Sequence, residues 1–138
     1  MTSDEKLRAL FDAARAIRAK AYAPYSRFQV GAALLGGDGR IYAAANVENA
    51  AFPQSQCAEA SAIGVMVAAG CREIAAVMVV AGAAGDDAVA PCGGCRQRLS
   101  EFAAPEVLVH MADESGIKTS RSIGELLPFS FGPKQLVP

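Results

Sequence analysis

Three cysteines and one glutamate in this chain have the types and spacing of a metal site that supports catalysis. Cys92 and Cys95 flank a Gly-Gly pair, and Cys57 stands alone upstream with Glu59 just after it. Thiolates bind Zn²⁺ well, and a structural zinc site usually completes its tetrahedron with a fourth cysteine or histidine. Three thiols therefore predict a zinc ion whose fourth position is open to water or substrate.

Glu59 distinguishes a catalytic from a structural interpretation of this cluster. Alone, it would be an acidic residue that favours a helix N-terminus. The CxxC pair alone would also be compatible with a redox-active pair, half of a zinc ribbon or two packed thiols. Beside three thiols, a carboxylate in the first helical turn is placed to carry protons without being a ligand itself. The combination favours catalysis.

The thiols are expected at the starts of two helices. The Ala-rich stretch from Cys57 closes on Gly70, a residue typical of the position just past a helix end. Pro91 precedes a second helical stretch that carries Cys92 and Cys95 one turn apart on the same face. Helix N-termini offer free N–H groups and partial positive charge, which stabilise thiolates.

The remaining pattern predicts a sheet that is covered by helices on both faces. Thr2 and Glu5 fit a capping box that starts an amphipathic helix, which ends before Pro24. Strands are expected over 28–35 and 40–45, where they form a hairpin. A mid-sheet strand over 75–81 and a strand over 107–111, joined by the second helix, form a βαβ unit. An edge strand is expected over 117–120, followed by a helical turn at 124–128. We predict a three-layer α/β/α sandwich with a mixed sheet of about five strands. It would form one catalytic domain over residues 1–138.

Composition restricts the class of partner. The chain has 13 Lys and Arg against 14 Asp and Glu, for a formal net charge of −1. A chain near neutrality lacks the basic surface that binds a nucleic-acid backbone, and no apolar run approaches the ~20 residues that span a bilayer. The N-terminal residues are polar and lack the apolar core of a secretory signal. We therefore expect a cytoplasmic protein that acts on a small molecule, with neither nucleic acid nor membrane as partner.

The motifs around the thiols extend into a pattern that covers nearly the whole chain. The cysteine and glutamate segments match the three-cysteine form of the zinc deaminase signature. Further matching segments are Pro24-Tyr25-Ser26, 28–34, Asn46-Val47-Glu48-Asn49-Ala50, Cys95-Arg96-Gln97, Glu125-Leu126-Leu127-Pro128 and Phe131-Gly132-Pro133. In this order they resemble the small, homotetrameric, zinc-dependent cytidine deaminases.

The resemblance implies a reaction for the cluster. Cys57, Cys92 and Cys95 would bind one Zn²⁺ per subunit, and Glu59 would transfer protons while water replaces the amine at C4 of the base. The expected reaction converts cytidine and 2'-deoxycytidine to uridine and 2'-deoxyuridine, in pyrimidine salvage. Two alternatives stay open: a deaminase of another cytosine nucleoside such as blasticidin S, and a non-catalytic interaction module stabilised by zinc.

The resemblance also implies the contacts with substrate. The base would pack on Phe28 and meet backbone groups of Ala58 and Ala90, and the ribose hydroxyls would bind Asn46 and Glu48. Phe52 and Phe131 match aromatic residues that family members contribute to a neighbouring subunit's pocket. We therefore expect a homotetramer whose active sites are completed by neighbouring subunits.

Ala60 follows Glu59 at a position where many family members have arginine. Three thiolates give the Zn²⁺ site a formal charge of −1, which makes the metal a poorer Lewis acid unless hydrogen-bond donors compensate. We expect N–H groups at the helix starts, aided by Arg96, to offset this charge.

Two further residues have side chains that bind metals in other proteins. His110 is the only histidine and lies in an apolar strand, and Cys71 follows the glycine that ends its helix. A Cys₂His site with His110 is conceivable, but Cys57 already supplies the third ligand. We expect both residues to be packed inside the fold.

Overall fold

One mixed sheet organises residues 2–136, the part of the chain that the computed structural model describes. Its strands are β1 (Gly31–Gly36), β2 (Ile41–Ala45), β3 (Ile74–Val80), β4 (Leu108–Asp113) and β5 (Gly116–Ser122), in the order β2-β1-β3-β4-β5. The central strand β3 runs parallel to β4, and the other neighbours are antiparallel. The hairpin, the mid-sheet strand, the parallel unit and the edge strand are all confirmed.

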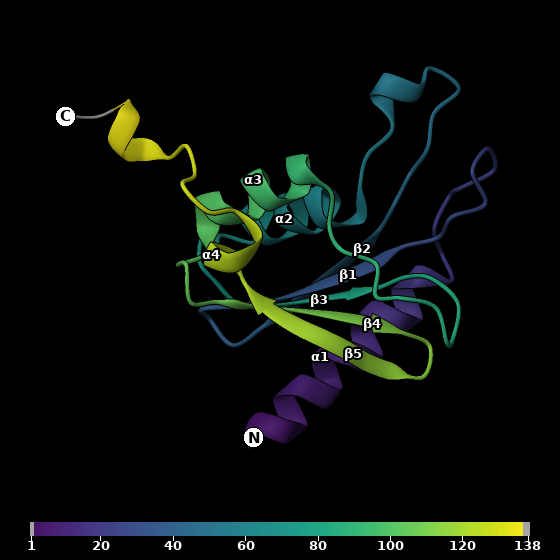
Figure 1. The fold of residues 1–138 in the computed structure, drawn as a ribbon, viewed down its shortest axis with the longest axis horizontal. Coiled ribbons are helices and arrows are strands. Elements are labelled where there is room, and N and C mark those ends of the chain that lie inside the picture. The colour runs from purple at the N-terminus through teal and green to yellow at the C-terminus, as the bar shows by residue number, and fades with distance from the viewer. Residues whose placement is uncertain (1, 137–138) are drawn as a thin grey trace.

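Helices cover both faces of this sheet (Figure 1). Helix α1 (Ser3–Arg18) contacts β1, β2 and β3 on one face, and α2 (Ala58–Ala68) lies beside α3 (Gly93–Phe102) on the other. The short α4 (Ile123–Leu126) follows β5. The predicted three-layer α/β/α sandwich is therefore confirmed. Within residues 2–136, no helix combines the length and the apolar character needed to cross a membrane.

Alternation along the strands divides the buried residues into two clusters. Successive side chains of a strand point to opposite faces of a sheet. In β3, Val77 and Val79 belong to the cluster beneath α2 and α3, whereas Met78 and Val80 belong to the cluster beneath α1. Because both faces are covered, the strand is apolar at nearly every position, which explains its unbroken run of hydrophobic residues.

Helix α1 begins and packs as its sequence predicts. The Thr2 hydroxyl accepts a hydrogen bond from the Glu5 N–H, and the Glu5 carboxylate accepts one from the Thr2 N–H. The buried side of the helix approaches β1 closely at Gly31, where a Cβ atom would lie 2.1 Å from the Ala14 carbonyl oxygen. Only glycine fits this position, so helix and strand pack backbone against backbone.

The first strand begins at Gly31 rather than at Phe28, which corrects its predicted start. Arg27 has a positive φ of 61°, which turns the chain just before this segment. The side-chain amide of Asn46 then takes the hydrogen bonds of the Phe28 carbonyl and the Val30 N–H, and the Asn46 backbone N–H donates to the Val30 carbonyl. Side-chain bonds thus replace part of the ladder that a neighbouring strand would supply.

Candidate active site

The three predicted metal ligands meet where two helices begin. Cys57 directly precedes α2, Cys92 directly precedes α3, and Cys95 lies in the first turn of α3. Their sulfur atoms all lie within 4.8 Å of one another. Sulfurs on a tetrahedral zinc are ~3.8 Å apart, given a Zn–S distance of ~2.3 Å. The donor set and its spacing therefore fit zinc, and among residues 2–136 this is the one such group of three or more metal-ligating side chains.

The pKa values of the three thiols are shifted in different directions by their surroundings. Burial raises the pKa values of the Cys57 and Cys95 thiols, and the negative charge of Glu59 adds to both shifts. The backbone N–H of Cys95 donates to the Cys92 sulfur and lowers the pKa of that thiol. This donor is one of the helix-start N–H groups expected to offset the thiolate charge. A dication at the cluster would favour the thiolate form of all three cysteines.

Glu59 lies inside the protein next to these thiols. It is the second residue of α2, only 4% of its surface is exposed, and burial raises the pKa of its carboxyl. The Cys95 side chain is within hydrogen-bonding contact of the carboxylate. A buried carboxyl group with a raised pKa is better matched to proton transfer near neutral pH than an exposed one.

A cavity of about 210 Å³ joins the thiols and Glu59 to a largely apolar wall. It is lined by Phe28, Val30, Asn46, Cys57, Ala58, Glu59, Val79, Val89, Ala90, Cys92 and Cys95. Eight of these are residues that the sequence predicts for the site. Segments far apart in the chain, including the turn before β1 and the loop before α3, thus come together around one space. The cavity is smaller than the ~300–1,000 Å³ typical of drug-sized ligands, so it suits a small ring.

Asn46 contributes to this cavity partly by holding its wall. Its Oδ1 accepts from the Val30 N–H at 2.8 Å, and its Nδ2 donates to the Phe28 carbonyl at 2.8 Å. An amide oxygen has two lone pairs and an amide nitrogen has two hydrogens, so each atom retains capacity for one more partner.

Glu48 is not among the residues that line the cavity. Its Oε1 accepts from the backbone N–H groups of Tyr25 and Ser26 at 3.0 and 3.1 Å, and its Oε2 accepts from the Ser26 hydroxyl. These bonds, the hydroxyl first, lower the pKa of the Glu48 carboxyl. Glu48 therefore anchors the loop before Phe28, and its predicted contact with ribose stays a prediction.

Phe52 and Phe131 also lie outside the cavity of this chain. Phe52 is 69% exposed in a short helical turn, η1 (Phe52–Gln54), and its ring contacts Tyr25 edge to face at 5.8 Å between centroids. Phe131 is 56% exposed and precedes η2 (Pro133–Gln135). Both segments project from the layered body of the fold (Figure 1).

Arg96 has contacts other than those expected. Its Nε donates to the Pro91 carbonyl at 2.8 Å and its Nη1 donates to the Leu126 carbonyl at 3.0 Å. The guanidinium thus joins the turn before Cys92 to α4 through backbone oxygens rather than through a thiol. Any compensation of the thiolate charge by Arg96 would therefore be indirect.

His110 and Cys71 are packed inside the fold, as expected. His110 is buried in β4, its Nδ1 lies 2.6 Å from the Ser120 hydroxyl, and burial lowers the pKa of the ring. Cys71 is buried, and its sulfur lies 3.4 Å from the Glu73 carbonyl oxygen to which it donates. Neither side chain belongs to the group of metal-ligating residues.

Three residues of the cavity wall were not selected from the sequence. Val30, Val79 and Val89 supply apolar surface that faces the thiols and Glu59. An apolar side chain near a strand end, such as Val30 or Val79, or in a loop, such as Val89, has no sequence signal that separates a core position from a wall position. For Val30 and Val89, the one sequence indication of a place in the cavity wall is that they lie next to or near the predicted contacts Phe28 and Ala90.

Comparisons with known proteins agree with this geometry. The family model of the cytidine and deoxycytidylate deaminase zinc-binding region matches residues 4–111. A cytidine deaminase of Sporosarcina psychrophila is 41% identical over 119 residues, 86% of each chain, and one of Mycobacterium tuberculosis is 39% identical over 114 residues, 83% of this chain and 80% of that one. The crystal structure of cytidine deaminase from Burkholderia pseudomallei superimposes with a TM-score of 0.83 at 42% identity, covering 95% of this chain and all of that one. With its thiol cluster and buried glutamate, the chain therefore belongs to the family of zinc-binding cytidine and deoxycytidylate deaminases.

Proposed function

We propose that this protein is a zinc enzyme that hydrolyses cytidine and 2'-deoxycytidine to the corresponding uridines and ammonia. The observation that carries the proposal is the buried Glu59 carboxyl in the same small cavity as three sulfurs that lie within 4.8 Å of one another. A purely structural zinc site needs neither a cavity nor a buried acid beside it. The names and similarity of the relatives support the same reaction.

In this proposal Cys57, Cys92 and Cys95 hold the zinc ion. When bound, zinc acts as a Lewis acid that makes water a competent nucleophile near neutral pH. The Glu59 carboxylate accepts a proton from the attacking water and delivers it to N3 of the base. It then transfers the second proton of the water to the departing amine, so that ammonia leaves and a C4 carbonyl forms. One residue thus serves as base and then as acid.

Residues around the cavity orient the substrate. The first N–H groups of a helix have no partner within it, so the Ala58 N–H is available to the carbonyl of the base. The Ala90 carbonyl accepts from the exocyclic amine, and the Phe28 ring packs on the base. Asn46 uses its remaining hydrogen-bonding capacity for a ribose hydroxyl, and Glu48 approaches the ribose from the adjacent loop.

The proposal includes a homotetramer whose subunits complete one another's active sites. Exposed large apolar side chains mark a surface that meets a partner where they gather, as Phe52 does with Tyr25 and Phe131 does with Phe129 two residues away. Phe52 and Phe131 are such side chains, and each lies on a projecting segment. The cavity within one chain is small for a whole nucleoside, which is consistent with walls added by a neighbour.

The proposed setting is pyrimidine salvage in the cytoplasm. All four cysteines are free, and three of them form the metal cluster. Free thiols of this kind are typical of reducing compartments. The nearly neutral charge of the chain favours a free nucleoside over a polynucleotide as substrate.

The test is turnover by the zinc-loaded protein. We expect purified protein with one equivalent of zinc to convert cytidine and deoxycytidine to uridine and deoxyuridine, followed by loss of cytidine absorbance and by release of ammonia. Blasticidin S, assayed in parallel, distinguishes the alternative nucleoside. A fully zinc-loaded protein that is inert towards cytidine and deoxycytidine would contradict the proposal, and the interaction-module alternative would then gain support.

A further inference from the structure

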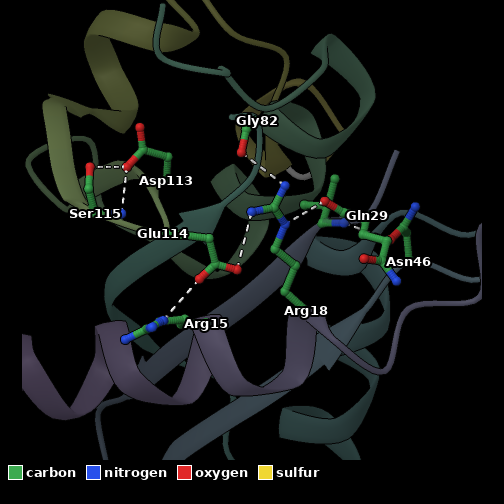
Figure 2. A network of polar contacts seen from close by, with 9 residues as sticks. Arg15, Arg18, Gln29, Asn46, Gly82, Asp113, Glu114 and Ser115 are labelled. Carbon is green, nitrogen blue, oxygen red and sulfur yellow. Dashed lines mark hydrogen bonds and ion pairs between the residues drawn. The ribbon is translucent and has the colours of Figure 1, made fainter. Parts of the chain in front are cut away.

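Arg18 connects three segments that are remote from one another in the chain (Figure 2). It is the last residue of α1, and its side chain is only 15% exposed. Its Nε donates to the Gln29 carbonyl at 2.9 Å, its Nη2 donates to the Gly82 carbonyl at 3.0 Å, and its Nη1 lies 3.4 Å from a carboxylate oxygen of Glu114. A basic residue in the last helical turn is ordinarily explained by the helix dipole, but these bonds lead away from the helix.

The first of these bonds acts on the aromatic wall of the cavity. Gln29 lies between Phe28 and Val30, which both line the cavity. Asn46 holds this short segment by the Phe28 carbonyl and the Val30 N–H, while Arg18 holds it by the intervening Gln29 carbonyl. Arg18 ends α1 and Asn46 directly follows β2, so the two side chains reach the segment from different elements. The segment is therefore fixed from two sides.

The second bond acts on the opposite wall. Gly82 opens the loop between β3 and α3 with a φ of 81°, a conformation that favours glycine. A Cβ atom at this position would lie 3.1 Å from a methyl carbon of Val89, and Val89 lines the cavity next to Ala90. Position 82 thus lies against the part of the loop that lines the cavity. By holding the Gly82 carbonyl, Arg18 fixes the base of this loop.

We propose that Arg18 is a positioning residue that sets the separation between the Phe28–Val30 wall and the Val89–Ala90 wall of the nucleoside cavity. The planar guanidinium has donors in a fixed fork, so it holds two carbonyls at a defined distance, whereas a lysine ammonium is a single point of charge. Glu114 orients the fork from the side that faces solvent. Arg18 does not line the cavity, so it acts through the walls and not on the reacting atoms.

This inference rests on the proposed function for its kinetic test. Arg18→Gln removes the fork, and we expect KM for cytidine to rise roughly tenfold while kcat changes by less than about threefold, because Glu59 and the thiols are held by α2 and α3. Hydrogen–deuterium exchange should increase in residues 27–31 and 82–90, and zinc content should stay at one equivalent. Arg18→Lys should recover only part of the change in KM.

Arg15→Gln is the matched control. Arg15 also pairs with Glu114, at 2.9 Å, but it is half-exposed on α1 and its hydrogen bond runs to that carboxylate. We expect its KM and exchange pattern to equal those of the wild type. Unchanged exchange in both segments for Arg18→Gln, or full recovery of KM in Arg18→Lys, would overturn the inference. If the wild type is inert on cytidine, the proposed function fails while the exchange data still decide the role of Arg18.

Discussion

At the residue scale, the site depends on three sulfurs that carry like charge when they bind a metal. Burial and mutual repulsion oppose the thiolate form of Cys57 and Cys95, and a metal dication offsets both effects. The fourth cysteine, Cys71, is buried elsewhere and serves as an internal comparison. The chain thus contains its own control for the role of a thiol.

We predict that Cys95→Ser lowers zinc affinity by more than roughly 100-fold. That is the most that loss of a residue hydrogen-bonded to a metal ligand usually costs, and this substitution removes a ligand itself. The measurement is zinc content after dialysis against a weak chelator, followed by competition titration. Cys71→Ala should keep one equivalent of zinc, with only a modest loss of stability. Equal zinc binding by Cys95→Ser and the wild type would remove Cys95 from the ligand set.

The residues that could be predicted from the sequence are those with unusual chemistry at a diagnostic spacing. The thiols and Glu59 fall into this group, and the structure brings them together. The sequence predicts Asn46 as a substrate contact, but it does not predict the bonds of Asn46 to the Phe28–Val30 backbone, because these depend on how two distant segments meet. The same reason conceals Arg18, whose partners lie on three separate segments.

At the scale of elements, α1 packs closely against β1 at Gly31, the residue after the cavity-lining Val30. A Cβ atom at Gly31 would meet the backbone oxygen of Ala14 at 2.1 Å, and backbone cannot move aside as a flexible side chain can. Helix α1 and strand β1 were predictable from the spacing of their apolar residues. Their packing distance was not, because a glycine in a strand can mark a bulge, a bend or a close backbone approach.

Gly31→Ala should lower the free energy of unfolding by about 3 kcal/mol, the upper part of the usual range for overpacking. Gly64→Ala is the matched control, since Gly64 lies within α2 and a Cβ atom there meets nothing within 4 Å. We expect this control to raise stability by about 0.5–1 kcal/mol through its higher helix propensity. Urea unfolding of both variants checks the pair, and equal stability of Gly31→Ala and the wild type would refute the packing argument.

The β4–β5 hairpin contains a buried carboxylate, Asp113, whose contribution to stability depends on pH. Asp113 accepts hydrogen bonds from the Ser115 N–H and hydroxyl at 2.8 and 2.5 Å, and it pairs with Lys118 at 3.2 Å. These contacts, the hydroxyl first, lower the pKa of Asp113 from 3.8 to about 2. A depressed pKa in the folded state stabilises the protein above the unfolded value, and that stability is lost as pH falls through the folded value.

We therefore expect Asp113→Asn to be less stable than the wild type at pH 7, with a difference that shrinks as the pH falls from about 4 to about 2. Thermal unfolding of both proteins at pH 7, 5, 4 and 3 measures the difference. Asp12→Asn, a change at an exposed acid of α1 outside this hydrogen-bond network, is the control for the loss of one negative charge. A difference for Asp113→Asn that is constant over this range would exclude the titration of Asp113 as its cause.

At the scale of the whole molecule, the proposed homotetramer would place the exposed aromatic residues Phe52 and Phe131 against neighbouring subunits. The sandwich was predictable because alternation, capping and turns all favour it, and the βαβ unit restricts how its strands are connected. Assembly is different, since a projecting Phe131 has the same sequence signal whether it contacts a neighbour or solvent. Whether Phe131 contacts a neighbour or solvent depends on whether a second subunit has a surface complementary to it.

Phe131→Ala should lower kcat/KM for cytidine about tenfold while zinc content is unchanged, because the side chain would reach a neighbour's cavity. Light scattering should give the mass of four subunits for the wild type. Ile117→Ala, at a half-exposed position of the edge strand β5, should leave kcat/KM unchanged. A wild type that is monomeric and fully active would contradict the shared active site.

We propose that the buried Glu59 transfers protons beside a zinc site of three thiolates. The most direct test is cytidine turnover by Glu59→Gln with zinc content measured on the same sample, and with Glu106→Gln, a change at an exposed position, as control. We predict one equivalent of zinc in both variants, full activity in Glu106→Gln, and a fall in kcat of roughly 10³-fold or more in Glu59→Gln. A zinc-loaded Glu59→Gln protein that turns over cytidine at the wild-type rate would exclude Glu59 as the group that transfers protons.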